Sequence, residues 1–372
     1  MTSILHVTDA SFAGVLVAVT DIARSQSELP GNRVTFVYVP RAQTPPLDEI
    51  QELAGEAVQV VRLGSSARLA VPTMLARLGG LIAREDPDVI HLHASRAGLI
   101  GRAVGLLRGA RGRVVYSPHG FAFDRAAFSP PKRTVYAGLE SLGARLAPAL
   151  ALCSPSEEAV ARRRLPHART AVLANGVDAD RLGAIAANRP PRAPHEPLRI
   201  VHVGRIGAQK MAPLFGRIAT AWLEAPPRPA RFIWIGEGDR RLLPPGVEIT
   251  GWLGRDALLS ELSRADLVLF TSDGEAMPMA LLEAQAMGVP VVGSRVTGVF
   301  DVVEDGVTGL VREGEADLAL ALASLALDDA TRARFSEAAM RRIRENFTTA
   351  NLADRSFAAY ATLGLRSPEG HP

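Results

Sequence analysis

The chain has 372 residues, of which 47% are hydrophobic and 22% charged, and its formal net charge is +3. This length and apolar content predict two domains with cores of their own, while so small a net charge gives no reason to expect a nucleic acid partner. The single cysteine, Cys153, excludes an intramolecular disulfide bond and a cage of thiolate metal ligands.

The sequence has no apolar run that approaches the roughly 18 residues of a membrane-spanning helix. Its first stretch, MTSILHVTDASFAGVLVAV, is apolar, but it lacks a positively charged leader and carries Asp9 in its middle. We therefore interpret it as a first strand and not as a signal peptide. We expect the protein in the cytoplasm.

Short strand-like runs alternate with helical segments along the first part of the chain. The runs are ILHVTD, VTFVYV, VQVVRL, VIHLH, VVYSPH, LALCSP and TAVLAN. Between most of them lie segments rich in Ala, Leu and Arg, such as VPTMLARLGGLIARE, whose apolar spacing is helical. This alternation is typical of a parallel sheet covered by helices on both faces, and it predicts a first domain over residues 1–187.

The run NRPPRAPHEP, residues 188–197, interrupts this pattern with four prolines and predicts a semi-rigid linker. The alternation resumes in a second domain, residues 198–345, with RIVHVGR, ARFIWIGEG, VEITGW, ADLVLFTS and VPVVGS. We expect residues 346–372 to form a C-terminal helix that crosses back to the first domain and ends in a frayed tail. Ligands of such sheets bind at the carboxyl ends of the strands, so a shared site would lie between two facing domains.

The stretch SDGEAMPMALLEAQAMGVPVVGSRVTG, residues 272–298, predicts a loop, a short helix, a buried strand and a loop. Pro278 suits the first position of the helix, and Gly288 suits its end. Glu275 lies just before this helix and Glu283 lies inside it. Because a helix N-terminus favours anions, two acids beside it suggest a ligand that carries both phosphate and hydroxyl groups, such as a nucleotide sugar.

The segment VHVGRIGAQK, residues 201–210, places Arg205 and Lys210 in a loop after a predicted strand. These two cations can close over a diphosphate, and Gly204 and Gly207 let the backbone approach it. Lys210 is one of only two lysines in the chain, against 40 arginines. Its compact point charge is either required at this position or retained by chance.

A histidine follows another predicted strand, in YSPHGFAF at residues 116–123. His119 is well placed there to meet a ligand, whereas we interpret His91 and His93 of VIHLH as structural histidines. Gly14, in the loop after the first strand, marks a second place where backbone could approach a ligand.

Two Asp-x-Asp pairs have the spacing with which many sugar transferases hold a divalent ion: Asp86 with Asp88, and Asp178 with Asp180. Such pairs are expected by chance in a chain of this length. The cations of the 201–210 loop and a helix N-terminus could neutralise a leaving diphosphate without an ion. We therefore expect neither a metal nor another cofactor.

Positive charge is concentrated in the first part of the chain. Residues 1–190 hold 22 Lys or Arg against 16 Asp or Glu, a net charge of +6, and the excess is densest over residues 102–164. This region is either the solvated face of an arginine-rich protein or a surface for anionic lipid headgroups or a pyrophosphate-linked acceptor.

Together these motifs resemble glycosyltransferase family 4, a large family of retaining enzymes with the GT-B fold. In chain order they are the Gly-containing first loop, PDVIHLH, SPHG, CSPSE, NGVD, VGR with Lys210, GEG, Glu275-x7-Glu283 followed by AMGVPVV, and EDGVTG. The resemblance covers nearly the whole chain and is nearest to bacterial enzymes that build capsule, exopolysaccharide or O-antigen repeat units. It implies an α/β fold of two doubly wound, Rossmann-like domains that face each other across a cleft, with the acceptor on the N-terminal side.

The resemblance also implies catalytic roles. Arg205 and Lys210 match the residues that hold the diphosphate, and Glu275 matches an acid that lies against the transferred sugar. His119 matches a histidine that contacts the sugar near the reacting carbon. Glu283 matches the acid that binds the ribose hydroxyls of the donor.

Further donor-binding positions follow from the same resemblance. Gly14 matches the loop that meets the donor phosphate and the acceptor, and Gly204 lies where backbone approaches the diphosphate. The backbone N–H groups of Ala276, Met277 and Met279 fall where sugar and phosphate oxygens would lie.

The chain departs from the family pattern at three places. Ala13 precedes Gly14 where paired glycines are usual, and Met211 follows Lys210 where a glycine is usual. Asp301 stands where a glutamate is common. The first departure concerns the geometry of the acceptor loop, and the third concerns the sugar pocket.

The resemblance favours a retaining, metal-independent hexosyltransferase. It would move a hexose or N-acetylhexosamine from a nucleotide diphosphate sugar, expected to be UDP-linked, to the hydroxyl of a glycan or lipid-linked sugar in cell-surface polysaccharide or glycolipid assembly. Peripheral contact with the inner face of the cell membrane would involve the basic region. Two alternatives share the fold: a non-hydrolysing UDP-sugar 2-epimerase and a catalytically inactive partner subunit. The Glu275-x7-Glu283 spacing and its AMGVPVV continuation favour transfer over epimerisation.

Overall fold

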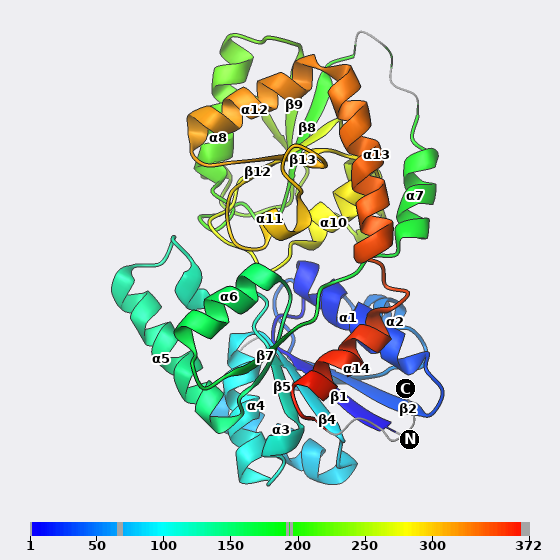
Figure 1. The fold of residues 1–372 in the computed structure, drawn as a ribbon, viewed down its shortest axis with the longest axis vertical. Helices are drawn as coiled ribbons and strands as arrows, with labels where there is room; N and C mark the ends of the chain where they lie inside the picture. Colours follow the sequence, from blue (N-terminus) through cyan, green and yellow to red (C-terminus); the bar gives the residue numbers. More distant parts are fainter. Residues whose placement is uncertain (1, 65–69, 191–192, 194–195, 366–372) are drawn as a thin grey trace. The chain divides into compact units, whose positions relative to one another are not determined.

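A computed structural model describes residues 2–64, 70–190, 193 and 196–365. The chain divides into two compact units (Figure 1). Unit 1 takes the described residues of 1–124, 128–176 and 349–372, and unit 2 takes 125–127 and 177–348. The division between the units thus falls after residue 176, whereas the sequence predicts a first domain that continues to residue 187. Residues 191, 192, 194 and 195 of the predicted linker and residues 366–372 of the predicted tail lie outside the described residues.

Unit 1 is built on one sheet of seven parallel strands in the order β3-β2-β1-β4-β5-β6-β7. The strands are β1 (Thr2–Thr8), β2 (Asn32–Tyr38), β3 (Gln59–Arg62), β4 (Val89–His93), β5 (Val114–Ser117), β6 (Ala149–Leu152) and β7 (Arg169–Val172). The helices are α1 (Ala13–Ser27), α2 (Leu47–Ala54), α3 (Val71–Glu85), α4 (Ser95–Leu107), α5 (Pro130–Leu146), α6 (Pro155–Arg164) and α14 (Leu352–Thr362), with short 3₁₀ turns η1 (Arg111–Arg113) and η2 (Ala122–Asp124).

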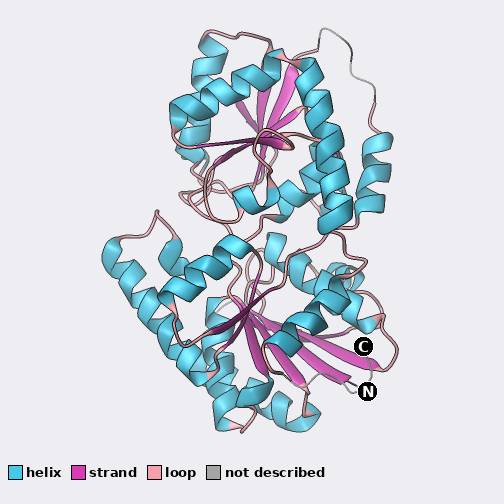
Figure 2. Ribbon diagram, viewed as in Figure 1, coloured by secondary structure: helices cyan, strands magenta, loops and turns pink. Residues whose placement is uncertain are grey.

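Two separate cores cover the two faces of this sheet. Along β5, Val114 and Tyr116 belong to one apolar cluster, while Val115 between them belongs to the other. Successive side chains of a strand point to opposite faces, so a strand buried on both faces must be apolar at nearly every position. The C-terminal helix α14 contributes Phe357 and Tyr360 to the second core. Figure 2 shows the resulting layers of helix, sheet and helix within each unit.

Unit 2 repeats this plan with six parallel strands in the order β10-β9-β8-β11-β12-β13. The strands are β8 (Leu198–Val203), β9 (Ala230–Ile235), β10 (Val247–Ile249), β11 (Leu267–Phe270), β12 (Val291–Ser294) and β13 (Gly309–Arg312). The helices are α7 (Ala179–Ala187), α8 (Ala212–Glu224), α9 (Arg255–Ser263), α10 (Met279–Ala286), α11 (Val299–Val302), α12 (Glu315–Leu327) and α13 (Asp329–Asn346), with the 3₁₀ turn η3 (Arg240–Leu242).

The predicted α/β class with two doubly wound, parallel-sheet units is therefore confirmed. All the strands predicted from the sequence are present, and β13 is an additional edge strand that the sequence reading missed. Each sheet has a switch point, where the chain first extends to one side and then returns to the other. The switch points lie between β1 and β4 in unit 1 and between β8 and β11 in unit 2. Ligands of doubly wound sheets bind beside the strand ends at such points.

Among the described helices, none combines the length and the apolar character that crossing a bilayer requires.

A buried ion pair fixes α5 against α4 in unit 1. The guanidinium of Arg102 donates to Glu140 Oε2 at 2.8 Å, and the Tyr116 hydroxyl donates to Glu140 Oε1 at 2.9 Å. Arg102 is fully buried, and Gly143 of α5 leaves the room that its guanidinium fills. A charge held in the interior in this way must keep its partner, because leaving either group unpaired is costly.

Two glycines of α5 provide a test of this packing. A Cβ at Gly143 would approach the Arg102 guanidinium closer than 3.0 Å, whereas a Cβ at Gly138 would meet nothing within 4 Å. We expect Gly143→Ala to lower the free energy of unfolding by roughly 2–3 kcal/mol through overpacking at the ion pair. The matched Gly138→Ala change should raise it by up to about 1 kcal/mol, because alanine is the better helix former. Urea denaturation followed by circular dichroism measures both, and equal effects of the two changes would contradict the packing described.

Candidate functional site

Three candidate residues of unit 2 lie in the two loops that follow the strands beside its switch point. Arg205 and Lys210 follow β8, and Glu275 follows β11. Arg205 is exposed and has no hydrogen-bond or ion-pair partner among the described residues. Its guanidinium is therefore available to an anion.

Glycines allow these loops to lie close together. A Cβ at Gly236 would run into the Gly204 carbonyl, and one at Gly238 would run into the Ile206 carbonyl, in each case closer than 3.0 Å. A Cβ at Gly204 would meet the Lys210 side chain at 2.9 Å. The GEG motif after β9 is thus a packing requirement of the loop after β8. Trp234 Nε1, on β9, also donates to the Gly204 carbonyl at 2.7 Å and so fixes the start of the loop after β8.

Lys210 and Glu275 form an ion pair, with Nζ 2.6 Å from Oε1. Ser272 Oγ donates to the same carboxylate oxygen at 2.6 Å. The ammonium also lies 4.7 Å from the centre of the Phe270 ring. Both charged side chains are largely but not fully buried, at 18% and 11% exposure. The pair brings one cation and one acid predicted from the sequence into direct contact at the carboxyl end of β11.

Helix α10 begins beside this pair. Pro278 is the N-cap and the helix begins at Met279, one residue later than the sequence predicts. Ala276 and Met277 lie in the turn before it, and no side chain caps the helix. Glu275 N–H donates to the Thr297 carbonyl at 3.1 Å, so the loop before α11 supports this turn from behind. The predicted backbone donors therefore precede or open a helix whose first N–H groups lack a side-chain cap.

Glu283 lies inside α10, and its side chain is 3% exposed. Arg255 Nη1, at the start of α9, lies 2.7 Å from Glu283 Oε1 and forms an ion pair with it. Burial raises the pKa of the carboxyl group, and the nearby Arg255 charge opposes that rise. A buried carboxylate with one cationic neighbour keeps further acceptor capacity, which hydroxyl groups of a ligand could use.

In unit 1, the loops at the carboxyl ends of the strands contain unusual backbone conformations. Ala13, Ala94 and His119 follow β1, β4 and β5, and all three have left-handed φ, at 53°, 67° and 52°. Non-glycine residues with such φ values are uncommon, and they cluster where the surrounding structure forces a functional geometry. Gly14 lies in the first turn of α1, directly after Ala13.

His119 is held from several directions. Its Nε2 lies 2.9 Å from His93 Nδ1, and its Nδ1 lies 3.4 Å from Cys153 Sγ. Glu157 of α6 accepts from Gly120 N–H at 2.7 Å and from Cys153 N–H at 2.8 Å, which joins the His119 loop to the end of β6. Burial lowers the pKa of His119 to about 4, so its ring is neutral at pH 7.

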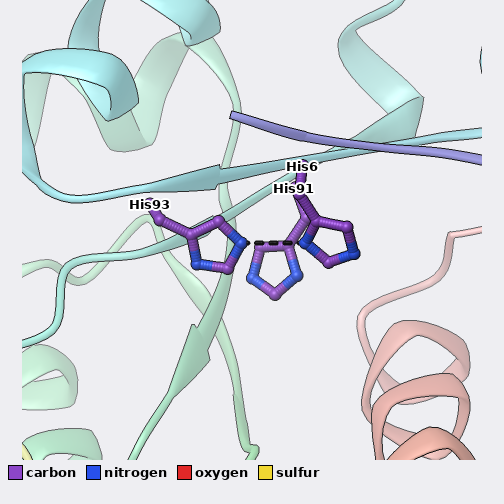
Figure 3. A group of neighbouring side chains, drawn as sticks. All are labelled: His6, His91 and His93. Carbon is purple, nitrogen blue, oxygen red and sulfur yellow. Dashed lines mark hydrogen bonds between the residues drawn. The ribbon is translucent and has the colours of Figure 1, made fainter. Parts of the chain in front are cut away.

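His6, His91 and His93 form a buried cluster on β1 and β4 (Figure 3). His6 Nδ1 lies 3.0 Å from His93 Nε2, and the rings of His91 and His93 are 4.0 Å apart. Each ring nitrogen of the three has a protein partner within 3.0 Å. This is the arrangement expected of structural histidines, as the sequence predicts for His91 and His93.

The Asp-x-Asp pairs have local contacts in the structure. Asp86 pairs with Arg113 at 2.5 Å, and Asp88 accepts from Ser3 N–H at 2.9 Å. Asp178 accepts from the Arg181 N–H at 2.9 Å and caps α7. Asp86, Asp88 and Asp178 thus each have a partner within the protein.

The structure explains two of the departures from the family pattern. Ala13 and Met211 stand where glycines are usual, and both have left-handed φ, at 53° and 45°. The backbone therefore keeps the conformation that favours glycine while carrying a side chain. At the third departure, Asp301 Oδ2 accepts from Gly298 N–H at 3.1 Å and caps α11.

Sequence reasoning missed several residues that support the candidate positions. Arg255 contacts Glu283 from α9, and Ser272 contacts Glu275 from within the loop that carries it, and nothing in the sequence marks either for that purpose. The sequence includes Glu157 in the CSPSE motif but does not indicate its contacts with the His119 loop.

Two models of glycosyltransferase domains match this chain. A model described as "Glycosyl transferase 4-like domain" matches residues 13–176, and one described as "Glycosyl transferases group 1" matches residues 197–328. The two matches follow the division into units 1 and 2.

One curated relative is the Escherichia coli UDP-Gal:α-D-GlcNAc-diphosphoundecaprenol α-1,3-galactosyltransferase, which is 27% identical over 264 residues. The alignment covers 64% of this chain and 66% of that enzyme, so slightly less than two thirds of the relative is spanned.

Solved structures share the fold over nearly the whole chain. Sucrose-phosphate synthase from Thermosynechococcus elongatus superposes with a TM-score of 0.80 at 17% identity, covering 98% of this chain and 99% of that one. The Anabaena protein HepE, in complex with UDP and glucose, superposes with a TM-score of 0.75 at 19% identity, covering 97% of this chain and 100% of that one.

The sequence expectation of a GT-B glycosyltransferase is therefore confirmed, and the chain belongs to glycosyltransferase family 4.

Proposed function

We propose that the protein is a retaining, metal-independent hexosyltransferase. It moves a hexose or N-acetylhexosamine from a UDP-linked sugar to an acceptor hydroxyl in the assembly of a cell-surface polysaccharide or glycolipid. Two comparisons support the choice of UDP and of a lipid-linked acceptor. The HepE structure contains UDP and glucose, and the E. coli relative is named for transfer from UDP-Gal to a GlcNAc-diphosphoundecaprenol.

The observation that carries this proposal is the buried Glu283 carboxylate of α10, which has the Arg255 guanidinium 2.7 Å from its Oε1. A diol such as ribose offers two hydroxyl donors, and hydrogen bonds to a charged acceptor contribute more than those between neutral groups. Arg205, with no partner among the described residues, and Lys210 lie in the neighbouring loop of the same unit. A ribose hydroxyl on Glu283 and a diphosphate on these cations together describe a nucleoside diphosphate.

The proposed reaction breaks the bond between the anomeric carbon and the diphosphate oxygen. The acceptor oxygen forms its bond to the same carbon on the same face, and its proton passes to the departing diphosphate. Negative charge grows on that diphosphate, where Arg205, Lys210 and the N-terminus of α10 would stabilise it. Lys210 would then exchange Glu275 for phosphate, and Glu275 would keep Ser272 and accept from a sugar hydroxyl.

Unit 1 is proposed to contribute His119 and the loop before Gly14. Both ring nitrogens of His119 have protein partners, and the ring is neutral. We therefore propose that His119 contacts the sugar without acting as an acid or a base.

The donor site is tested by Glu283→Gln, which keeps the shape of the side chain and removes its charge. Loss of a charge-assisted hydrogen bond should weaken UDP binding roughly 10- to 100-fold. Lys210→Ala should nearly abolish sugar transfer, because a cation that stabilises the leaving group is lost. Isothermal titration with UDP measures the first effect, and release of UDP in the presence of an acceptor measures the second.

Glu248→Gln is the matched control, because it removes an exposed acid of unit 2 that pairs with Arg231 on the sheet edge. It should leave UDP binding unchanged. Equal UDP affinity of the Glu283→Gln variant and the unmodified protein would contradict the donor assignment. Formation of a new UDP-sugar without any acceptor would indicate an epimerase, and an absence of both transfer and donor hydrolysis would indicate an inactive partner subunit.

We also propose that one surface of unit 1 contacts an acidic membrane. Val135, Leu139 and Leu142 repeat at helical spacing on α5 and are 62%, 40% and 49% exposed. Apolar side chains aligned on an exposed helix face, with cations around them, are typical of a helix that lies in a membrane interface. Lys132 at the start of α5 is one such cation, and α6 of the same unit ends in three arginines.

A cavity of about 320 Å³ lies on another side of α5, lined by Phe123, Pro130, Arg133, Thr134, Ala137 and Arg164. Two guanidinium groups at a partly apolar cavity suit the phosphate of a lipid headgroup or of a lipid-linked diphosphate acceptor.

The membrane proposal predicts binding to vesicles that contain phosphatidylglycerol, weakened by salt, with little binding to pure phosphatidylcholine. Replacing both Leu139 and Leu142 with Asp should reduce the bound fraction roughly tenfold or more, because two apolar side chains can no longer be buried. Cosedimentation with vesicles measures this.

The matched control replaces Leu320 and Leu327 with Asp. These leucines are 69% and 58% exposed on one face of α12 in unit 2. If the α12 variant and the α5 variant lose binding equally, or if the unmodified protein ignores acidic vesicles, the surface of α5 is not the contact.

A further inference from the structure

A continuous chain of hydrogen bonds leads from the buried face of α1 to His119. It runs from Gln26 Oε1 to His6 Nε2 at 2.8 Å and from His6 Nδ1 to His93 Nε2 at 3.0 Å. It continues from His93 Nδ1 to His119 Nε2 at 2.9 Å and ends at Cys153, whose Sγ lies 3.4 Å from His119 Nδ1. Figure 3 shows the His6–His93 link and the neighbouring ring of His91.

The direction of this chain is set at its far end by α14. Ser356 Oγ donates to the Ala353 carbonyl at 2.6 Å, so its oxygen is left to accept from Gln26 Nε2 at 2.7 Å. The amide nitrogen of Gln26 therefore faces α14, and its carbonyl oxygen faces His6. Because an amide oxygen only accepts, His6 Nε2 must carry the proton.

The rings that follow are neutral. Burial lowers the pKa of His6 to about 4 and holds that of His93 well below its usual value. In the described part of the chain, the hydrogen-bond partners of these rings are amides, hydroxyls, a thiol and one another, and none is a carboxylate that would favour a charged ring. A neutral imidazole has one N–H and one lone pair, so each ring passes on the direction that it receives.

Following that rule gives one arrangement of protons. His6 donates from Nε2 and accepts at Nδ1, so His93 donates from Nε2 and accepts at Nδ1. His119 must then donate from Nε2 to His93, and its Nδ1 accepts from the thiol of Cys153. Burial raises the pKa of that thiol, which keeps the proton on sulfur.

A second branch from the same amide agrees with this direction. Tyr360 accepts from Gln26 Nε2 at 3.0 Å and donates to His91 Nδ1 at 2.8 Å. His91 Nε2 then donates to Ser117 Oγ at 2.8 Å, and Ser117 donates to the Ala151 carbonyl at 2.6 Å. Every group in both branches has a partner of the opposite kind, which is the condition for a stable buried network.

We propose that Gln26, His6 and His93 are positioning residues that hold His119 as its Nε2–H tautomer, with the ring turned toward β4. They act through His119 and touch no substrate. The inference rests on the proposed function only in assigning His119 to the transfer site, because the tautomer itself is a property of unit 1.

The tautomer can be measured without any substrate. In protein labelled with ¹⁵N-histidine, two-bond ¹H–¹⁵N correlation spectra distinguish Nε2–H, Nδ1–H and charged rings, and His119→Gln assigns the signal. We expect His119 as the neutral Nε2–H form at pH 7 and at pH 5.5. His93→Gln should retain this form, because a carboxamide supplies one acceptor and one donor, whereas His93→Leu should give a mixture of tautomers.

Gln26→Met repeats the test from the far end and leaves all the rings in place. This variant should also give a mixture of His119 tautomers, because no amide oxygen then requires a proton on His6 Nε2. Circular dichroism and thermal unfolding establish that each variant is folded. A charged or Nδ1–H ring in the unmodified protein would overturn the proposal, and so would an unchanged His119 signal in folded His93→Leu and Gln26→Met.

The rate of sugar transfer is the second measurement that tests the proposal. A misplaced contact at the reacting centre costs roughly 10- to 100-fold in kcat/KM, so His93→Leu should lose this much and His93→Gln should recover most of it. If the spectra behave as expected and transfer does not change, the hydrogen-bond chain stands and the assignment of His119 to the transfer site fails. If the spectra do not behave as expected, the chain fails whatever the activity.

Discussion

In each unit, two neighbouring parallel strands whose following segments leave toward opposite faces of the sheet determine where a ligand of that sheet can bind. β1 and β4 diverge in this way in unit 1, as do β8 and β11 in unit 2. Helices cover the faces of each sheet, and ligands of such sheets bind beside the diverging strand ends. Arg205, Lys210 and Glu275 of unit 2 lie in the loops that follow β8 and β11, and the left-handed residues Ala13 and Ala94 of unit 1 follow β1 and β4. Apolar strands buried on both faces fix the positions of those ends, so the core determines the geometry of the site.

The strands could be predicted from the sequence because burial on both faces leaves an almost continuous apolar run, as in VIHLH and VLFT. Lys210 and Glu275 could be predicted to lie near each other because both follow central strands. The proximity of Arg255 to Glu283 could not be predicted, since it depends on how α9 packs beside α10 and no local pattern records that packing. Helix α10 begins one residue later than predicted, because Pro278 adopts an extended conformation and serves as the N-cap. β13 was missed because an edge strand of four residues has too short an apolar pattern.

The histidines show how a correct interpretation of single residues can miss their joint role. His91 and His93 are structural in the sense that every ring nitrogen has a partner. Their connection to His119 depends on the register of β1 against β4, which places His6 opposite His91, and on a helix more than 300 residues away in sequence. Alternation along one strand indicates which side chains share a face, but the partner across the sheet is known only once the strand order is known. Long-range pairing is therefore the part of such a site that a single sequence conceals.

The hydrogen-bond chain ends in an amide at one side and a thiol at the other, and this has a consequence for proton movement. An imidazole relay conducts protons when a group at each end can give one up or take one in. The Gln26 amide does neither near neutral pH, so a proton that entered at Cys153 would have nowhere to leave. The chain is thus insulated: it can transmit orientation between α14 and His119, but it cannot carry net charge. Protons taken up or released by groups in the interior of unit 1 therefore do not reach His119 through this chain.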